Sequence, residues 1–431
     1  MAKDTSTKLR NQVIYQIFTR NYKDGTFKSV ENDLDRIKSL GVDYIYLLPV
    51  QPSGKVNRKG SMGSPYAIKD YRGIDPVQGT MEDFISLSNA IHEAGMKLMI
   101  DVVYNHTSPD SVLAKEHPEW FYKKDDGNFG NRIGDWWDVI DLDYNNKDLW
   151  DYQIDTLKMW AKYVDGFRCD VAPMIPLDFW LLARSEVSKV NPECVWLSES
   201  IEYSFIEYLR KNNITALSDS EIYQAFDICY DYDVYPYMKN AITGDGCLNQ
   251  YLSKVNTQEV IYPANYCKLR CLENHDRPRA AAMIPNDNVL LNWMAWNYFQ
   301  KGIVMLYAGE EFCVTHHPTL FDLDTVDFNT GKDISSFVKS LSDIKRDSIF
   351  TNSFFTSKVV GNDIILATYE AYKDSACNHK KAIGIFSTTS VSKAVSVPLE
   401  DGTYKNAINY EDVDVYEGIL SYRGYPIIIL V

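Results

Sequence analysis

The sequence predicts a (β/α)8 barrel with a small inserted domain after its third strand and a C-terminal antiparallel β-sandwich. Between residues 13 and 347, short apolar runs alternate with apolar residues at helical spacing, which is typical of parallel strands joined by helices. Beyond residue 350 the helical period disappears, and short β-branched and aromatic runs take its place. The predicted domains are the barrel at residues 1–106 and 147–349, the inserted domain at 107–146 and the sandwich at 350–431.

The first part of the barrel contains three apolar runs. The second of them is nearly continuous apolar sequence, as expected for a strand that is covered on both faces. The loop after it extends to about residue 80, far beyond the usual 2–6 residues of a strand-to-helix connection, and we expect it to be functional. Thr80 then begins a helix with a capping box. The three strands are predicted at residues 13–18, 42–50 and 97–103.

The inserted domain is predicted because prolines and glycines interrupt residues 107–146, which show no sustained period. Regular alternation resumes at Trp150 with a strong helical stripe. The remaining strands are predicted at residues 164–172, 194–200, 214–220, 266–275 and 303–308, and the helices at 177–191, 204–213, 287–301 and 333–347, with an irregular helical span at 221–258.

The composition favours a neutral substrate. Among 431 residues, 59 Asp and Glu outnumber 44 Lys and Arg, and this net charge of −15 argues against nucleic acid or an anionic membrane as partner. The 30 Tyr and 9 Trp can stack on sugar rings, although we expect most of them in the core. A polar amino terminus, the absence of long apolar runs and eight cysteines without metal-ligand spacing lead us to expect a cytoplasmic protein.

Polar residues gather where four of the predicted strands end. Arg168 and Asp170 lie two residues apart and therefore share one face of a strand, where charges need partners. The stretches 100–106, 195–200 and 272–276 follow the same pattern of an apolar strand that ends in acids, amides or histidines. Because the carboxyl ends of barrel strands meet at one face, these four strand ends predict one shared site.

In this order the four stretches resemble the characteristic regions of the α-amylase family of glycoside hydrolases. The most specific matches are Gly166-Phe167-Arg168-Cys169-Asp170 and Glu273-Asn274-His275-Asp276, and the resemblance covers roughly residues 10 to 350. It implies a retaining α-glucan hydrolase that cleaves α-1,4-glucosidic bonds in maltooligosaccharides or starch fragments without an organic cofactor. An α-glucosidase, a neopullulanase, a 4-α-glucanotransferase and a non-catalytic binding relative remain alternatives. The expected partner is an α-glucan oligosaccharide, and no oligomeric state is predicted.

Three acids are the candidates for catalysis. Breaking a glycosidic bond requires one protonated carboxylic acid and a second carboxylate that faces the anomeric carbon. The sequence by itself does not assign these roles, because they depend on the surroundings of each carboxyl group. The resemblance implies that Asp170 is the nucleophile, that Glu199 is the general acid/base, and that Asp276 positions sugar hydroxyls and stabilises the transition state.

Six further residues are predicted to bind the substrate or to support the acids. Arg168 is expected to lower the pKa of Asp170 and keep it ionised. His106 and His275 are expected to donate hydrogen bonds to sugar hydroxyls, although both could instead be packed structural histidines. The resemblance implies that Tyr66 stacks on the sugar next to the cleaved bond and that Asp101 and Arg279 buttress the site.

The resemblance also raises the question of calcium, because the family often binds it beside the inserted domain, with the position of Asn105 as one ligand. The sequence departs from this pattern after Asp170, where residues 171–174 lack a Lys-His pair that many members carry. The first loop, residues 21–27, lacks the acid-rich loop that binds a metal in related α-glucosidases. Calcium is therefore possible at Asn105, but we expect none to be required.

Overall fold

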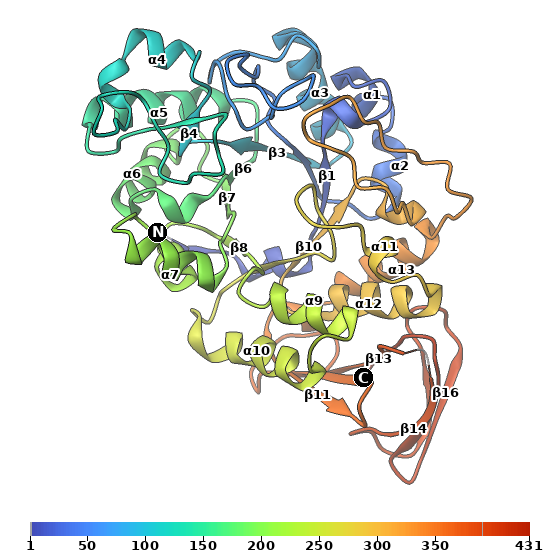
Figure 1. Cartoon of the computed structure of the whole chain (residues 1–431). Coiled ribbons are helices and arrows are strands. Elements are labelled where there is room, and N and C mark those ends of the chain that lie inside the picture. The colour runs from blue at the N-terminus through green and yellow to red at the C-terminus, as the bar shows by residue number, and fades with distance from the viewer. Residues whose placement is uncertain (1, 390) are drawn as a thin grey trace.

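A closed barrel of eight parallel strands lies at the centre of the computed structural model, which describes residues 2–389 and 391–431 (Figure 1). The strands are β1 (Val13–Ile17), β2 (Tyr44–Leu47), β3 (Lys97–Val102), β6 (Gly166–Cys169), β7 (Val195–Ser198), β8 (Ile228–Tyr230), β9 (Lys268–Arg270) and β10 (Ile303–Tyr307). Around the barrel they follow the order β1-β10-β9-β8-β7-β6-β3-β2, which places β7 opposite β1. This confirms the predicted fold class.

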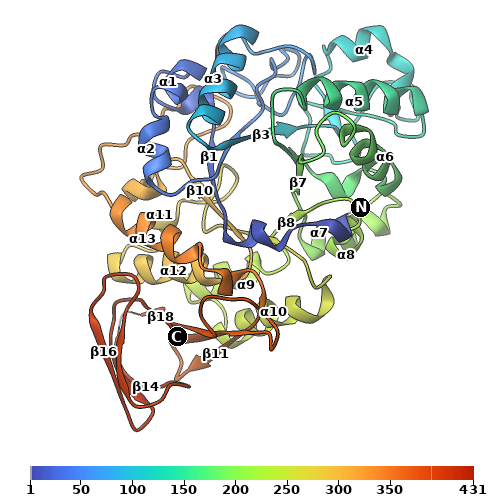
Figure 2. The same cartoon turned by 180° about the vertical axis from the view of Figure 1, so that it is seen from behind.

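The helices surround the barrel, as Figure 2 shows from behind. They bury the outer faces of the strands, so that every residue of β1, β2 and β10 is buried, and this explains their continuous apolar sequence. The helices are α1 (Phe27–Glu31), α2 (Leu34–Ser39), α3 (Met81–Glu93), α5 (Lys147–Trp160), α6 (Leu177–Val187), α7 (Tyr203–Lys211), α8 (Asp219–Ile222), α9 (Tyr235–Thr243), α10 (Leu248–Ile261), α11 (Ala280–Met283), α12 (Asp287–Phe299) and α13 (Ser335–Lys345). Among the described residues, no helix is both long and apolar enough to cross a membrane.

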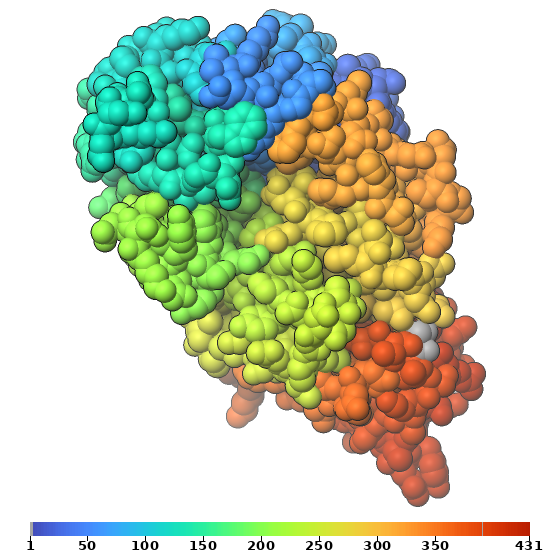
Figure 3. All heavy atoms as spheres, viewed as in Figure 1, coloured from blue at the N-terminus to red at the C-terminus, as the bar shows by residue number. Residues whose placement is uncertain are grey.

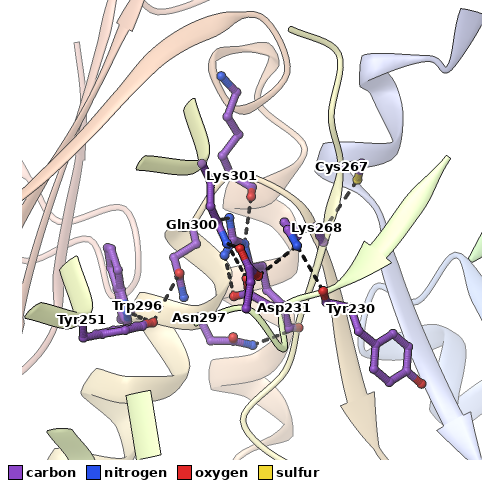
Figure 4. Close-up of polar contacts among 12 residues, drawn as sticks. Tyr230, Asp231, Tyr251, Cys267, Lys268, Trp296, Asn297, Gln300 and Lys301 are labelled. Carbon is purple, nitrogen blue, oxygen red and sulfur yellow. Dashed lines mark hydrogen bonds and ion pairs between the residues drawn. The ribbon is translucent and has the colours of Figure 1, made fainter. Parts of the chain in front are cut away.

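The prediction of a strand at residues 214–220 is wrong, because the sixth barrel strand is β8, further along the chain. Asp231 and Asp233 follow this three-residue strand, and they pair with cations of β9 instead of lying in an apolar environment. The fully buried Lys268 donates to the carbonyl of Tyr230 (Figure 4). It also lies 2.9 Å from Asp233, and Arg270 pairs with Asp231. The apolar run of β8 is only three residues long, and the acids of these buried ion pairs directly follow it, so the strand pattern is too short to recognise.

The segment between β3 and α5 contains α4 (Val112–Glu116) and a two-stranded sheet of β4 (His106–Thr107) and β5 (Ile140–Asp141). Figure 1 shows α4 and β4 beside α5 at the rim of the barrel. The antiparallel pairing brings His106 opposite Asp141, so that both ends of this segment return to the same place. The domain boundaries at residues 107 and 146 stay a prediction.

The C-terminal part contains two four-stranded antiparallel sheets, in the orders β11-β12-β13-β18 and β14-β17-β16-β15. Their strands are β11 (Ser353–Val360), β12 (Ile364–Ala371), β13 (Lys381–Ser387), β14 (Ser392–Ser396), β15 (Gly402–Lys405), β16 (Asp412–Tyr416), β17 (Ile419–Arg423) and β18 (Ile427–Leu430). Their facing side chains, such as Ile383 and Val395, form a separate apolar core. The sandwich packs against α12, where the rings of Trp296 and Phe386 lie 5.8 Å apart.

Candidate active site

Arg168 lies at the centre of the predicted site and joins three carboxyl groups. The register of the barrel pairs it with Asp101 of β3, and Asp170 and Glu199 follow directly after the neighbouring strands β6 and β7. The buried guanidinium donates to Asp101 Oδ1 at 2.9 Å and to Asp170 Oδ1 at 3.1 Å, and it lies 2.9 Å from Glu199 Oε1. The other oxygen of Glu199 accepts a hydrogen bond of 2.8 Å from the backbone N–H of Val171.

One guanidinium does not neutralise three carboxylates. The pKa of Asp170 is raised well above its ordinary value, first because the group is buried and second because Glu199 is negative, and Arg168 offsets only part of this. The expected lowering of the Asp170 pKa by Arg168 is present, but burial and the charge of Glu199 outweigh it. Burial and the neighbouring negative charge thus favour the protonated form of Asp170, while Arg168 favours its carboxylate.

Tyr66 and His275 form a hydrogen-bonded wall between Asp101 and Asp276. Gln16 Nε2 donates to His275 Nδ1 at 3.0 Å, which leaves the imidazole proton on Nε2. That nitrogen lies 2.6 Å from the Tyr66 hydroxyl and 3.1 Å from Asp276 Oδ2, and the hydroxyl in turn donates to Asp101 at 3.1 Å. Burial, followed by the charge of Arg168, lowers the pKa of His275 well below its ordinary value, so this histidine is a neutral donor.

His106 is the second histidine beside the acids, and it lies near Asp170. Its Nε2 is 3.9 Å from Asp170 Oδ2, and its ring is 5.4 Å from the ring of Trp136. Burial lowers the pKa of His106 to about 4, and the nearby Asp138 only partly offsets this. A neutral imidazole at this position can donate a hydrogen bond to a sugar hydroxyl without adding charge to the site.

The acids open into a cleft of about 230 Å³. Of the predicted residues, its lining includes Tyr66, His106, Asp170, Glu199 and Asp276. Sequence reasoning missed the other lining residues: Lys59, Ser64, Trp136, Asp138, Val139, Val171, Leu320 and Phe321. Most of these come from loops without a periodic pattern, where the only available signal was the unusual length of the loop after β2.

Asp101 and Arg279 lie behind this lining as buttresses. Both side chains are fully buried. Asp101 accepts hydrogen bonds from Tyr46 and Arg168, which orients the arginine. Arg279 donates to Glu273 at 2.6 Å and to the carbonyl of Ala308 at 3.0 Å, and it thereby joins the ends of β9 and β10. These contacts fit support of the site better than direct binding of substrate.

The residues around Asn105 do not fit a calcium ion. Asn105 and Arg132 line the same polar cavity, and the Arg132 guanidinium lies 3.4 Å from Asp141 Oδ2 and donates to the carbonyl of Leu142. A fixed positive charge in the cavity repels a cation, and calcium requires six to eight oxygen ligands. Among the described residues, no group of three or more His, Cys, Asp and Glu side chains is arranged to hold a metal.

Comparisons with known proteins agree with this geometry. The family profile described as "Alpha amylase, catalytic domain" matches residues 12–361, and the profile described as "Bacterial Alpha amylase C-terminal domain" matches residues 356–429. A crystal structure of an alpha-amylase from Lactobacillus plantarum is 45% identical, covers 99% of this chain and 100% of that chain, and has a TM-score of 0.95. A maltogenic alpha-amylase from Thermotoga neapolitana is 31% identical over 98% of this chain and 99% of that chain, with a TM-score of 0.86.

The curated relatives are more distant and longer. An alpha-1,4-glucan:maltose-1-phosphate maltosyltransferase from Picrophilus torridus is 25% identical over 77% of this chain and 54% of its own length. An alpha-amylase from Haloarcula japonica is 27% identical over 80% of this chain and 50% of its own length. The chain thus spans about half the length of these relatives. Because the catalytic-domain profile alone covers most of the sequence, the chain belongs to the alpha-amylase family of glycoside hydrolases.

Proposed function

We propose that this enzyme is a retaining α-glucan hydrolase that cleaves α-1,4-glucosidic bonds in maltooligosaccharides or starch fragments. The observation that carries the proposal is the placement of Asp170 and Glu199 in one cleft, bound to the same guanidinium. The two residues follow neighbouring strands, and the backbone N–H of Glu199 donates to the carbonyl of Cys169 at 3.0 Å. Retaining glycosidases hold their two carboxyl groups about 5–5.5 Å apart, which suits a covalent intermediate.

The reaction then takes two steps. In the first, the Asp170 carboxylate attacks the anomeric carbon, and Glu199 gives its proton to the departing glycosidic oxygen. In the second, Glu199 takes a proton from water, and the resulting hydroxide displaces Asp170 from the sugar, which regenerates both groups. Asp276 orients the sugar hydroxyls, the neutral His106 donates a hydrogen bond to them, and His275 holds Asp276 in place through its Nε2–H. An uncharged substrate fits this arrangement, because the site is already crowded with negative charge.

Incubation with maltose to maltoheptaose, followed by chromatography of the products, tests the proposal against its alternatives. We expect maltooligosaccharides to be shortened, and pullulan to be cut far more slowly. Release of glucose alone would indicate an α-glucosidase, rapid cleavage of pullulan a neopullulanase, and dominant products longer than the substrate a 4-α-glucanotransferase. Because several relatives carry the name maltosyltransferase, maltose 1-phosphate is included, and release of phosphate would contradict hydrolysis. No turnover of any substrate would indicate a binding protein.

The raised pKa of Asp170 predicts the acid side of the pH profile. The nucleophile must be ionised, so activity falls as the pH decreases through its pKa and the carboxylate takes up a proton. We expect the acid limb of kcat/KM to have its midpoint clearly above the ordinary Asp value of about 3.9. Recovery of full activity on return to neutral pH controls for acid unfolding. A reversible limb at or below the ordinary value would contradict the raised pKa.

The misfit of calcium at Asn105 predicts that chelation has little effect. Dialysis against EDTA should leave both kcat/KM and the melting temperature unchanged, because Arg132 already supplies positive charge in the cavity. Activity assays and thermal melts before and after dialysis measure this, and calcium added back to untreated enzyme is the control. A large loss on chelation that calcium reverses would show that Asn105 belongs to a metal site.

A further inference from the structure

Lys59 and Asp138 form an ion pair in the lining of the cleft. Lys59 lies in the long loop after β2, and Asp138 lies in the segment between β3 and α5. Their Nζ and Oδ1 atoms are 2.7 Å apart, with side-chain exposures of 21% and 5%, so the pair is largely shielded from water. Lys59 also lies over the rings of Trp137 and Phe321, at 5.3 and 5.7 Å from their centroids. The pair therefore joins two loops across the surface of the cleft.

The loop after β2 is also fastened to the loop after β10. The backbone N–H of Met62 donates to the carbonyl of Phe321 at 2.9 Å, and the N–H of Ser61 donates to Asp322 at 2.8 Å. Gly60 makes this approach possible, because its φ is +61° and a Cβ atom there would lie 2.5 Å from the Phe321 carbonyl oxygen. In Figure 3 the blue surface of the β2 loop lies between the teal inserted segment and the orange β10 loop. Three loops thus form one wall.

The β2 and β10 loops of this wall lie across the barrel from Glu199. β2 and β10 flank β1, and β1 is opposite β7, the strand that Glu199 follows. Glu199 protonates the oxygen of the leaving sugar, which belongs to the part of the glucan that continues to the reducing end. The sugar that becomes attached to Asp170 belongs to the part that continues to the non-reducing end. The wall therefore faces the non-reducing side of the cleaved bond.

We propose that the Lys59–Asp138 pair closes the cleft on this side, binds the hydroxyls of the non-reducing terminal sugar, and makes the enzyme act near that end of the chain. The inference rests on the proposed function and specifies which bond is cut. The ammonium group supplies donors and the carboxylate supplies acceptors, which together match vicinal hydroxyls. The cleft of about 230 Å³ is also smaller than the range of about 300–1,000 Å³ that is usual for ligand pockets, as expected for a short bound segment.

The test compares maltoheptaose with maltoheptaose that carries a ketal on O4 and O6 of its non-reducing terminal sugar. For the wild-type enzyme we expect kcat/KM to be about 100-fold lower on the capped substrate, because the cap collides with the wall. Lys59→Ala and Asp138→Asn each break the ion pair and should reduce this difference in kcat/KM about tenfold. Both variants should also release longer products from uncapped maltoheptaose than the wild-type enzyme does. Lys59→Arg should keep the wild-type ratio, because it preserves the ion pair.

Lys393→Ala is the matched control, because it removes a lysine that pairs with Asp363 in the sandwich, and it should leave the ratio unchanged. Equal kcat/KM of the wild-type enzyme on both substrates would overturn the inference and leave the proposed function standing. No cleavage of either substrate would overturn the proposed function and the inference together. A wild-type ratio in both Lys59→Ala and Asp138→Asn would show that the pair does not close the cleft. The wild-type comparison decides the question even if a variant does not fold.

Discussion

Asp170→Asn and Glu199→Gln should each abolish most of the activity while leaving the fold intact. Loss of the general acid at Glu199 should lower kcat by about 10²–10⁴-fold, and loss of the nucleophile at Asp170 should cost at least as much, since no covalent intermediate can form. Steady-state kinetics on a maltooligosaccharide measure both effects. Asp155→Asn is the control, because this acid is exposed on α5, where it pairs with Lys158. Its kinetics should equal those of the wild-type enzyme.

Thermal melts of the same variants separate chemistry from stability. The raised pKa of Asp170 shows that burial and the charge of Glu199 oppose its ionisation, so a neutral amide relieves part of that repulsion. We therefore expect the melting temperatures of Asp170→Asn and Glu199→Gln to equal or exceed that of the wild-type enzyme. A folded Asp170→Asn variant with near-normal kcat would contradict the assignment of the nucleophile.

Arg168→Met should have the largest effect on stability. The substitution keeps most of the side-chain volume but leaves Asp101, Asp170 and Glu199 without their shared cation. Breaking one partner of a buried ion pair typically costs about 3–5 kcal/mol, and here three carboxylates lose theirs. Denaturant unfolding followed by fluorescence measures the loss. Arg210→Met is the control, because its half-exposed pair with Glu221 should contribute only about 0–1 kcal/mol.

The pH dependence of this loss gives a second readout. Without Arg168 the folded-state pKa values of Asp101 and Asp170, which are already raised, rise further above those of the unfolded chain, so the folded state binds more protons than the unfolded state over that range. The stability of Arg168→Met relative to the wild-type enzyme should therefore improve as the pH is lowered from 7 towards 5. An unfolding free energy equal to that of the wild-type enzyme at pH 7 would show that Arg168 is not the counterion of these groups.

The barrel could be predicted where apolar strands are long, and the prediction failed at β8, whose apolar run is only three residues. β1, β2 and β10 are buried on both faces, and their sequences are therefore almost continuously apolar. β8 is short and is bordered by acids, because its neighbours Lys268 and Arg270 carry their charges into a buried cluster (Figure 4). Their pairing partners lie far apart in the chain, and no local pattern reveals them. The strand was therefore placed too early in the sequence.

The acids of the site could be predicted because Asp170 and Glu199 directly follow β6 and β7, Asp276 lies in the loop after β9, and barrel geometry brings strand ends together. The net pKa shift of Asp170 could not, since it depends on the balance between burial, Glu199 and Arg168. Lys59 and Asp138 were also missed. Each lies in a loop without periodicity, and only the folded chain brings the two loops close enough for Lys59 and Asp138 to form an ion pair.

Proton NMR of the first products tests the central claim, a covalent intermediate on Asp170, most directly. Hydrolysis of a maltooligosaccharide by a high concentration of enzyme is followed before mutarotation equilibrates the new reducing ends. Two successive displacements at the anomeric carbon retain its configuration, so the account predicts that the α-anomer signal appears first and the β-anomer grows only at the rate of mutarotation. Initial release of the β-anomer would mean direct attack by water and would contradict the assignment of Asp170 as nucleophile.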